Sequence, residues 1–442
     1  MILLDNIFQY QTLSKIKDIL IFIDSLGVEW GFVGGIPRDF LLFKTKLKTN
    51  EIDIVFLVPV TKIFLLIVDK FKDLVAQKYF HDRFITGKVV LTNGTVIDVI
   101  TAREEFYASE AQLPIVEPTS NIKADIYRRD ITINAIFFKR KLKHPDKIFE
   151  IIDLVGGYKD LIQSVCRFIY PTSLQDDPTR IYRILRYKNR FNFKVENNSL
   201  EMIKNSLHYI DLLSINRVYN ELTKINQEKK FDKIYEDFFK IGFDPINLNS
   251  FNPHNLQIVK DLKILRKSII SFEKFFAHHQ KKLKLCIDRN KIIFSFLVSK
   301  NFLKNEKYQN ILSKDIYKFS NIWREILSIN PLTSKSLKKF YIQELNKYNC
   351  IEVFVALIYM LYQHQRTDLK KIVRYLFRKK YLNRFKITAK FIHSIAQYYY
   401  PQKNICQNTI LNLLKKANYL YYLNKIRTSS QLIRYVRKKL TK

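Results

Sequence analysis

Glycine placement constrains this chain more than any other feature of its sequence. All nine glycines of the 442 residues lie before residue 243, and residues 243–442 contain none. Glycine supplies the left-handed and tightly turned backbone that connects short strands and helices. Residues 1–157 are therefore predicted to form a turn-rich, mixed α/β part. The rest of the chain is predicted to form packed helices.

Hydrophobic periodicity predicts the elements within these two parts. Asn93-Gly94 is a strong turn signal that closes two strands into a hairpin. Pro37 suits the first turn of a helix, which would begin beside Gly34-Gly35. In the first part we expect helices at 13–26, 37–43 and 62–74, and strands at 30–33, 52–58, 84–91 and 96–101. In the second part helical spacing recurs at 178–190, 212–226, 256–276, 292–302 and 353–362.

The charge balance indicates a polyanionic partner. The chain has 76 Lys and Arg against 41 Asp and Glu, a formal net charge of +35. Nucleic acid or an acidic membrane would attract such a protein, although an AT-rich genome also raises the lysine count. The longest apolar runs, 63–68 and 353–362, are too short to cross a membrane. Basic and aromatic residues interleave at 374–384 and 398–400, which suits single-stranded or tRNA-like RNA, with an ordinary helical core and a lysine-rich exterior as the alternative.

The cysteines and the N-terminus bear on the compartment. The four cysteines are far apart and lack metal-ligand spacing, which is typical of a reducing compartment. The first residues, Met1 to Asp5, lack the basic start of a signal or transit peptide. We therefore expect a bacterial cytoplasm, or the interior of an organelle with its own AT-rich genome, such as a plastid.

The first candidate constellation combines a glycine pair with carboxylates. Gly34 and Gly35 let backbone N–H groups approach a bulky anion closely, and Arg38 follows at once. Glu51 and Asp53 would share one face of a strand, where they can hold divalent metal ions beside a triphosphate. A third carboxylate on a neighbouring strand often completes such a site, and Asp98 is the best candidate. The pattern indicates nucleotidyl transfer, with surface charges on an edge strand as the alternative.

Two further constellations are rich in arginine. In the segment 127–135, Arg129 can bind a triphosphate, and Asp130 or Asn134 can bind ribose hydroxyls; a capped helix end is the alternative. In the segment 176–186, arginines recur every three residues along one side of a helix, behind an aspartate at its start. We expect the arginines of this stripe to need a bound anion, with a stripe that is simply solvated as the alternative. The aspartate and the first arginine together can pair with the Watson–Crick edge of a base. The residues are Asp177, Arg180, Arg183 and Arg186.

Together these motifs closely resemble the bacterial-type (class II) tRNA nucleotidyltransferase and poly(A) polymerase family, in the polymerase-beta-like nucleotidyltransferase superfamily. The resemblance covers residues 30–222, and no specific motif is found beyond about residue 225. Its motifs are Gly34-Gly35-x-x-Arg38-Asp39, Glu51-Ile52-Asp53, Asp98-Val99, Thr101-Ala102-Arg103-Glu104, Leu113-Pro114, Arg128-Arg129-Asp130-x-Thr132-Ile133-Asn134-Ala135, Gly156-Gly157-x-x-Asp160, Asp177-Pro178-x-Arg180-x-x-Arg183-x-x-Arg186 and Ser214-Ile215-Asn216-Arg217-x-x-x-Glu221.

The resemblance implies an α+β head with a small mixed sheet, followed by an all-α neck, body and tail. The expected bounds are a catalytic head at 1–157, a base-reading neck at 158–228 and a basic, RNA-binding body and tail at 229–442. It also implies residue roles. Gly35 and Arg38 would contact the triphosphate, and Glu51 and Asp53 would bind Mg²⁺. Arg129 with Asp130 would hold phosphates and ribose. Asp177 and Arg180 would read the base, supported by Arg183 and Arg186. Arg217 and Glu221 would lie behind the base-reading helix.

Two positions depart from the family pattern. Glu51 stands where the family has aspartate, and its carboxylate is one methylene farther from the backbone. It is still a hard oxygen ligand, so Mg²⁺ binding is expected, with some rate lost if the placement shifts. Asp176 stands where the base-reading motif begins with glutamate, while the pair Asp177 and Arg180 is intact.

The leading hypothesis is an RNA 3′-end nucleotidyltransferase that builds or repairs the CCA end of tRNA from CTP and ATP. Its partner is then tRNA, with no membrane and no obligate protein partner inferred. A poly(A) polymerase of the same family, or an enzyme that adds only CC or only A, would use the same residues. A non-catalytic RNA-binding relative is a hypothesis of another class, motivated by Glu51 and by the divergent tail.

Overall fold

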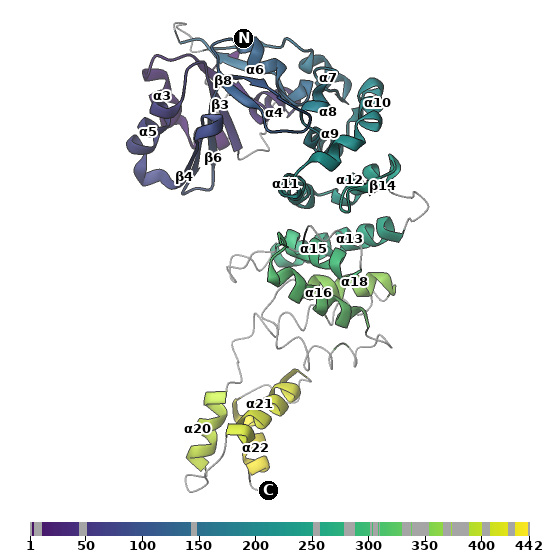
Figure 1. Cartoon of the computed structure of the whole chain (residues 1–442). Coiled ribbons are helices and arrows are strands. Elements are labelled where there is room, and N and C mark those ends of the chain that lie inside the picture. The colour runs from purple at the N-terminus through teal and green to yellow at the C-terminus, as the bar shows by residue number, and fades with distance from the viewer. Residues whose placement is uncertain are drawn as a thin grey trace. The chain divides into compact units, whose positions relative to one another are not determined.

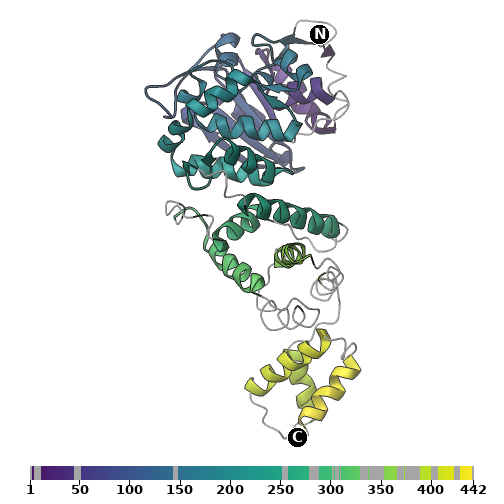
Figure 2. The same ribbon diagram turned by 90° about the vertical axis from the view of Figure 1, so that its right-hand side faces the viewer.

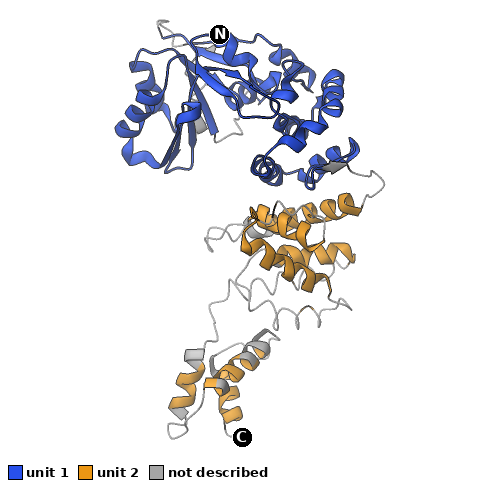
Figure 3. Ribbon diagram, viewed as in Figure 1, with its two compact units in different colours: residues 1–253 blue, residues 254–442 orange. Residues whose placement is uncertain are grey.

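The computed structural model describes most of the chain and divides it into two compact units. Unit 1 comprises residues 1–253 and unit 2 comprises residues 254–442 (Figure 3). The segments described are 2–3, 11–43, 51–142, 148–250, 257–277, 288–300, 310–328, 353–365, 389–399, 407–422 and 429–440, with the single residues 303, 308, 337 and 373.

Unit 1 is built on a mixed sheet of eight strands in the order β1-β10-β9-β2-β3-β6-β5-β4. Strands β3, β4 and β6 of this sheet are labelled in Figure 1. Only β3 and β6 run parallel among these neighbours, and the other pairs are antiparallel. Its strands are β1 (Ile2–Leu3), β2 (Trp30–Val33), β3 (Glu51–Phe56), β4 (Val75–His81), β5 (Thr86–Leu91), β6 (Val96–Thr101), β9 (Phe137–Arg140) and β10 (Ile148–Ile152). A separate antiparallel pair comprises β7 (Arg103–Phe106) and β8 (Ile115–Pro118).

One face of this sheet is covered by α3 (Lys17–Ser25) and α5 (Thr61–Lys70). Trp30 donates from its indole Nε1 to Asp24 of α3 at 3.0 Å. Gly87 lies so close to the Phe64 ring of α5 that an added Cβ would stand 2.1 Å from it. Because successive strand residues point to opposite faces, Lys88 must project from the other face of the sheet.

The opposite face of the sheet has its own apolar core and carries the polar residues of interest. Val33, Val55 and Phe137 pack there against Ile126 of α6 (Ile122–Tyr127). Val55 shares its face with Asp53, two residues earlier in β3. The remaining helices of this part that bear on the site are α4 (Gly35–Phe43), α7 (Gly157–Gln163) and the 3₁₀ turn η3 (Thr132–Asn134).

The rest of unit 1 is mainly helical. Helix α9 packs against α11 and α12, and buries Tyr182 against Phe238 at 4.8 Å between ring centroids. Four two-residue strands form two pairs in this part, β11 (Val165–Cys166) with β12 (Lys194–Val195), and β13 (Phe243–Asp244) with β14 (Asn249–Ser250). The helices are α8 (Ser173–Asp176), α9 (Thr179–Phe191), α10 (Asn197–Asn205), α11 (Ile215–Gln227) and α12 (Phe231–Lys240).

The described part of unit 2 consists of helices, in two packed groups (Figure 2). The first group buries Trp323 against Phe296 and Tyr359, and Tyr359 donates to the fully enclosed Asp261 at 3.0 Å. Its helices are α13 (Gln257–Ala277), α15 (Arg289–Ser299), α16 (Lys314–Leu327) and α18 (Val353–Gln363). The second group is α20 (Ala389–Tyr399), α21 (Gln407–Tyr422) and α22 (Ser429–Leu440).

The predicted fold class is confirmed: a mixed sheet with helices comes first, and a largely helical remainder follows. The hairpin that Asn93-Gly94 predicts is the pair β5–β6. The single helix expected at 13–26 is instead α2 (Gln11–Ser14) and α3, and the helix expected at 62–74 ends at Lys70. The basic segment 374–384 lies outside the described residues, and the domain bounds at 157 and 228 stay predictions. Among the residues described, no helix is long and apolar enough to cross a membrane.

Candidate active site

Two carboxylates meet where the parallel strands β3 and β6 pair. Asp53 and Asp98 are register partners, and Glu51 lies two positions before Asp53 on the same face. Asp98 in turn accepts from Nζ of Lys88 at 3.2 Å, from the adjacent strand β5. The predicted group of Glu51, Asp53 and Asp98 is therefore brought to one face of the sheet.

The electrostatics of this pair favour a bound cation. Burial and the neighbouring Asp98 raise the pKa of Asp53 to about 6. Burial also raises the pKa of Asp98, although Lys88 opposes that rise. Two partly buried carboxylates of like charge are costly because they lose solvation and repel each other. A divalent ion bound to their hard oxygens offsets both the lost solvation and the repulsion. The donor chemistry thus fits a hard divalent cation, although no group of three or more His, Cys, Asp or Glu is close enough to enclose an ion within the described segments.

The glycine pair lies directly against this carboxylate group. Gly34 follows β2, whose last residue, Val33, is the register partner of Asp53. Gly34 has φ +66°, and a Cβ there would stand 2.8 Å from Oδ2 of Asp53. Gly35 begins α4, so the first turn of this helix lies next to the carboxylates. Its free backbone N–H groups and the positive end of the helix dipole favour an anion at that place.

Arg38 is one turn into α4 and is buried. Its Nε and Nη2 donate to Oδ1 of Asp39 at 2.9 and 2.8 Å, and its Nη1 donates to Asn134 at 2.6 Å. The guanidinium also lies over the rings of Tyr187 and Phe191. The structure thus places Arg38 and Asn134, both predicted nucleotide-binding residues, in direct contact with each other.

Asp130 connects the segment after α6 to helix α9. Its carboxylate accepts from Nε of Arg183 at 2.7 Å, from Nδ2 of Asn134 at 3.3 Å and from its neighbour's backbone N–H at Ile131. Although burial opposes it, Arg183 and these hydrogen bonds lower the pKa of Asp130 to about 2. Asp130 is thus an ionised, fixed acceptor at neutral pH.

Asp177 lies just before α9 and keeps one oxygen available. Its Oδ1 accepts from the backbone N–H and hydroxyl of Thr179 at 3.0 and 2.6 Å, and from Nη2 of Arg217 at 2.8 Å. Its Oδ2 has no hydrogen-bond partner in the described segments, and a quarter of the side chain is exposed (25%). This oxygen is therefore free to contact a ligand.

Arg180 is fixed by neutral partners rather than by acids. Its Nη1 donates to the hydroxyls of Tyr170 and Ser173 at 2.8 and 2.6 Å, and its Nη2 donates to the backbone carbonyl of Arg128 at 2.7 Å. Its guanidinium also stacks 5.3 Å from the centre of the Tyr170 ring. The contact joins α9 to the segment after α6, 52 residues away.

The expectation that the arginine stripe of α9 needs an external anion was wrong for two of its members. Arg183 pairs with Asp130 at 2.7 Å, and Arg186 lies 3.7 Å from Glu228. These acids come from other parts of the sequence, so spacing within α9 did not reveal them. In the described segments, Nε of Arg186 is nevertheless buried without a hydrogen-bond partner.

Four residues that take part in the site were not predicted from the sequence. The position of Lys88 could have been predicted from the hairpin, because the turn at Asn93-Gly94 places Lys88 opposite Asp98. Asp125 is fully buried and pairs with two successive arginines, Arg128 and Arg129. Its position three and four residues before them on a helix is a local signal that could have been used. Tyr170 and Ser173 carry no such signal.

A sheet that presents paired carboxylates beside a glycine-initiated helix, joined to a helix that begins just after Asp177 and bears Arg180, is typical of a nucleotidyltransferase domain. Comparison with known proteins agrees. The family model of the Poly A polymerase head domain matches residues 31–167. Residues 31–167 of this chain are thus similar to the head domain of that family.

Individual relatives fall into two groups by the nucleotides they add. The A-adding tRNA nucleotidyltransferase of Geobacter sulfurreducens is 31% identical over 222 residues, which cover 50% of this chain and 24% of that protein. The CCA-adding enzyme of Staphylococcus haemolyticus is 26% identical over 349 residues, 77% of this chain and 76% of that protein. A solved CCA-adding enzyme in an apo form superposes with a TM-score of 0.64 at 25% identity, covering 94% and 93% of the two chains. The match thus spans about a quarter of the A-adding relative.

Proposed function

We propose that this protein is a template-independent RNA 3′-end nucleotidyltransferase that adds or repairs the CCA end of tRNA from CTP and ATP. The observation that carries the proposal is the placement of Asp53 beside Asp98 and against Gly34, at the start of α4. That arrangement supplies carboxylates for metal ions and a helix N-terminus for phosphates at one place. The CCA-adding relative, which matches over most of both chains, supports the choice of product.

Mg²⁺ is the cofactor that these residues fit best, held by Glu51 and Asp53 with Asp98 beside them. When bound, such ions lower the pKa of an attacking hydroxyl and neutralise the leaving pyrophosphate. Glu51 and Asp53 would orient the α-phosphate, and the backbone at Gly34-Gly35 would face the triphosphate. Arg129 and Arg38 would add positive charge on the same side.

In the reaction, the RNA 3′-hydroxyl forms a bond to the α-phosphorus of CTP or ATP. The bond from that phosphorus to the bridging oxygen breaks, and pyrophosphate leaves with the electron pair. Asp98, the register partner of Asp53, would accept the hydroxyl proton. Arg129 and Arg38 would balance the charge that develops on the phosphates.

Base choice would rest on Asp177 and Arg180. The free oxygen of Asp177 is an acceptor and the guanidinium of Arg180 is a donor, so together they can pair with a Watson–Crick edge. Arg217 fixes the first group and Tyr170 fixes the second. Because both groups are held by the protein, the chain itself takes the place of a template.

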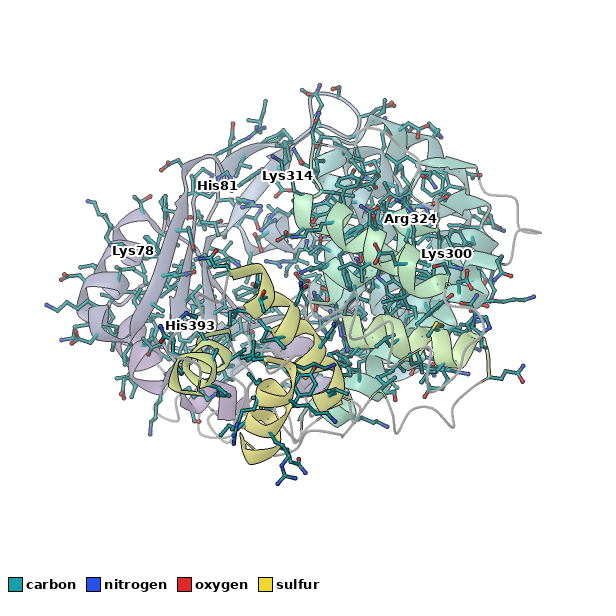
Figure 4. All side chains as sticks on the ribbon, turned by 90° about the horizontal axis from the view of Figure 1, so that it is seen from below. Lys78, His81, Lys300, Lys314, Arg324 and His393 are labelled. Carbon is teal, nitrogen blue, oxygen red and sulfur yellow. The ribbon has the colours of Figure 1, made fainter. Side chains whose placement is uncertain are left out.

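The RNA would be bound by the basic surface of the helical parts. In unit 2, Lys314, Lys318 and Arg324 are exposed along α16, and the side chains of Lys314 and Arg324 are marked in Figure 4. Phosphate neutralisation by such residues gives affinity without sequence dependence. The reaction requires tRNA, CTP and ATP in one compartment, which we propose is the cytoplasm or the interior of an organelle with its own AT-rich genome.

The test uses the purified full-length protein, Mg²⁺ and a tRNA transcript that stops before CCA, with CTP alone, ATP alone or both. Two additions with CTP, and a third only when ATP is also present, are expected. A long ladder with ATP alone would instead assign poly(A) synthesis. No extension under any condition would favour a non-catalytic RNA-binding protein.

A second candidate, an enzyme that adds only the terminal A, is favoured by the 31% identity to the A-adding relative. A transcript that already ends in CC distinguishes the two. An A-adding enzyme would extend that transcript by one residue with ATP, and would leave the transcript without CC unchanged in CTP. A CCA-adding enzyme would extend both.

A further inference from the structure

Asp125 is a fully buried carboxylate that holds two successive arginines. Its Oδ1 accepts from Nε and Nη2 of Arg128 at 2.9 and 2.6 Å, and its Oδ2 accepts from Nη2 of Arg129 at 2.6 Å. The backbone N–H of Arg103 also points to Oδ1. These contacts hold the pKa of Asp125 well below its usual range, although burial opposes them. The carboxylate is therefore ionised, with each oxygen committed to a different arginine.

The two arginines lead to different parts of the site. The guanidinium of Arg129 lies within electrostatic reach of Asp53, where it opposes the rise in pKa that burial causes. Its Nε is buried and has no hydrogen-bond partner in the described segments. The backbone carbonyl of Arg128 accepts from Nη2 of Arg180 at 2.7 Å. One arginine thus borders the carboxylates, and the other supports the base-reading residue.

Arg128 has a second acidic partner that Arg129 lacks. Glu105 of β7 accepts from Nη1 of Arg128 at 3.0 Å, from Nε of Arg103 at 2.9 Å and from the hydroxyl of Tyr107 at 2.9 Å. In the described segments, Asp125 alone contacts both Arg128 and Arg129. Loss of Asp125 would leave Arg129 without an acid partner, whereas Arg128 would keep Glu105.

We propose that Asp125 is a positioning residue that sets Arg129 beside the carboxylate strand and, through Arg128, sets Arg180 for base reading. This inference rests on the proposed function of the site. A buried arginine that loses its acid partner is left as an uncompensated buried charge. Arg129 already interacts electrostatically with Asp53, so the freed guanidinium would compete with a metal ion for that carboxylate. For Arg180, displacement of the Arg128 carbonyl loosens one of its three fixed contacts.

The experiment compares the full-length wild type with Asp125→Asn, using tRNA lacking CCA. The Mg²⁺ concentration for half-maximal rate is expected to rise about 10-fold, as for other residues that orient a metal site indirectly. Incorporation of GTP and UTP relative to CTP should rise as well. The affinity for a non-hydrolysable CTP analogue, measured calorimetrically without tRNA, should fall. An unchanged Mg²⁺ requirement and unchanged discrimination would overturn the inference.

The matched control is Asp24→Asn. Asp24 is the carboxylate partner of the buried Arg140, on α3 at the opposite face of the sheet. This variant should lose stability and keep the wild-type Mg²⁺ requirement and base choice. If both variants shift these readouts equally, Asp125 acts only through stability and the inference fails.

Two more variants address misfolding of Asp125→Asn. Asp125→Glu keeps the charge and should restore part of the Mg²⁺ affinity. Glu105→Gln weakens Arg128 and leaves Arg129 paired, so it should reduce base discrimination and leave the Mg²⁺ requirement unchanged. A change in the Mg²⁺ requirement alone in Glu105→Gln would contradict the division of roles. Failure of the proposed function is separate, because the wild type itself would then add no nucleotide.

Discussion

Gly34 lies against Asp53 so closely that a Cβ on Gly34 would stand 2.8 Å from the Oδ2 atom of that aspartate. The contact joins the end of β2 to the carboxylate of β3, and α4 begins at the next residue. Gly34 also has φ +66°, a conformation that side chains disfavour. This position thus requires glycine for two reasons: its backbone conformation disfavours other residues, and the carboxylate of Asp53 occupies the space that a side chain would need.

Gly34→Ala is therefore expected to reduce activity by about 100-fold, since the new methyl group displaces the carboxylate by a fraction of an ångström. The measurement is the single-turnover rate of CTP addition. Gly94→Ala is the control, because Gly94 also has positive φ (+81°) but has no heavy atom within 4 Å of an added Cβ. Both variants should lose about 1–2 kcal/mol of stability. Equal loss of activity in both would show that backbone strain, not the contact with Asp53, is responsible.

Glu51→Asp is expected to raise the rate of nucleotide addition, by up to about 10-fold, because the shorter side chain restores the ligand length that the family uses. The readout is the rate at saturating Mg²⁺, with the mirror variant Asp53→Glu as control. Asp53→Glu should lower the rate, because the longer side chain has Gly34 in its way. A slower Glu51→Asp enzyme would mean that the rest of the site is fitted to glutamate.

Arg217→Met is expected to weaken base discrimination by about 10-fold, since Asp177 loses a charged hydrogen-bond partner and is no longer fixed. The measurement is the ratio of CTP to UTP incorporation on tRNA lacking CCA. Lys224→Met, on the same helix α11, removes an exposed cation that pairs with Glu221 and should leave the ratio unchanged. If Arg217→Met lowers all rates in proportion, Arg217 does not act on base choice.

Stability without metal should depend on pH through Asp53. Burial and Asp98 raise the pKa of Asp53 to about 6, so the folded state binds the proton more tightly than the unfolded state does. The stability that the folded state gains by binding this proton is fully present below pH 3.8, the ordinary pKa of the side chain. It is lost as the pH rises through about 6. In EDTA, the Tm of Asp53→Asn should therefore rise by a few °C relative to that of the wild type as the pH increases from about 4 to about 6, and the difference should stay level above that. A constant difference between the two proteins would contradict this assignment.

Much of the head could be predicted because its signals are local. The strand bounds 30–33 and 96–101 agree with β2 and β6, and the hairpin turn lies where Asn93-Gly94 predicts it. The edge strand β4 was missed, because most of its residues are exposed and it lacks clean alternation. The break between α2 and α3 was missed as well, since apolar spacing continues across it.

The sequence by itself determined the glycine pair, the spacing that puts Glu51 and Asp53 on one face, and the arginine repeat of α9. These features depend on residue type and on period within a single element. Only the tertiary structure decided which groups meet: Asp53 with Asp98 through parallel pairing, Arg183 with Asp130, and Asp125 with the arginines that lead to both halves of the site. Such contacts join residues far apart in the chain or choose among several local partners. Their choice depends on how the sheet and helices pack, which no local pattern specifies.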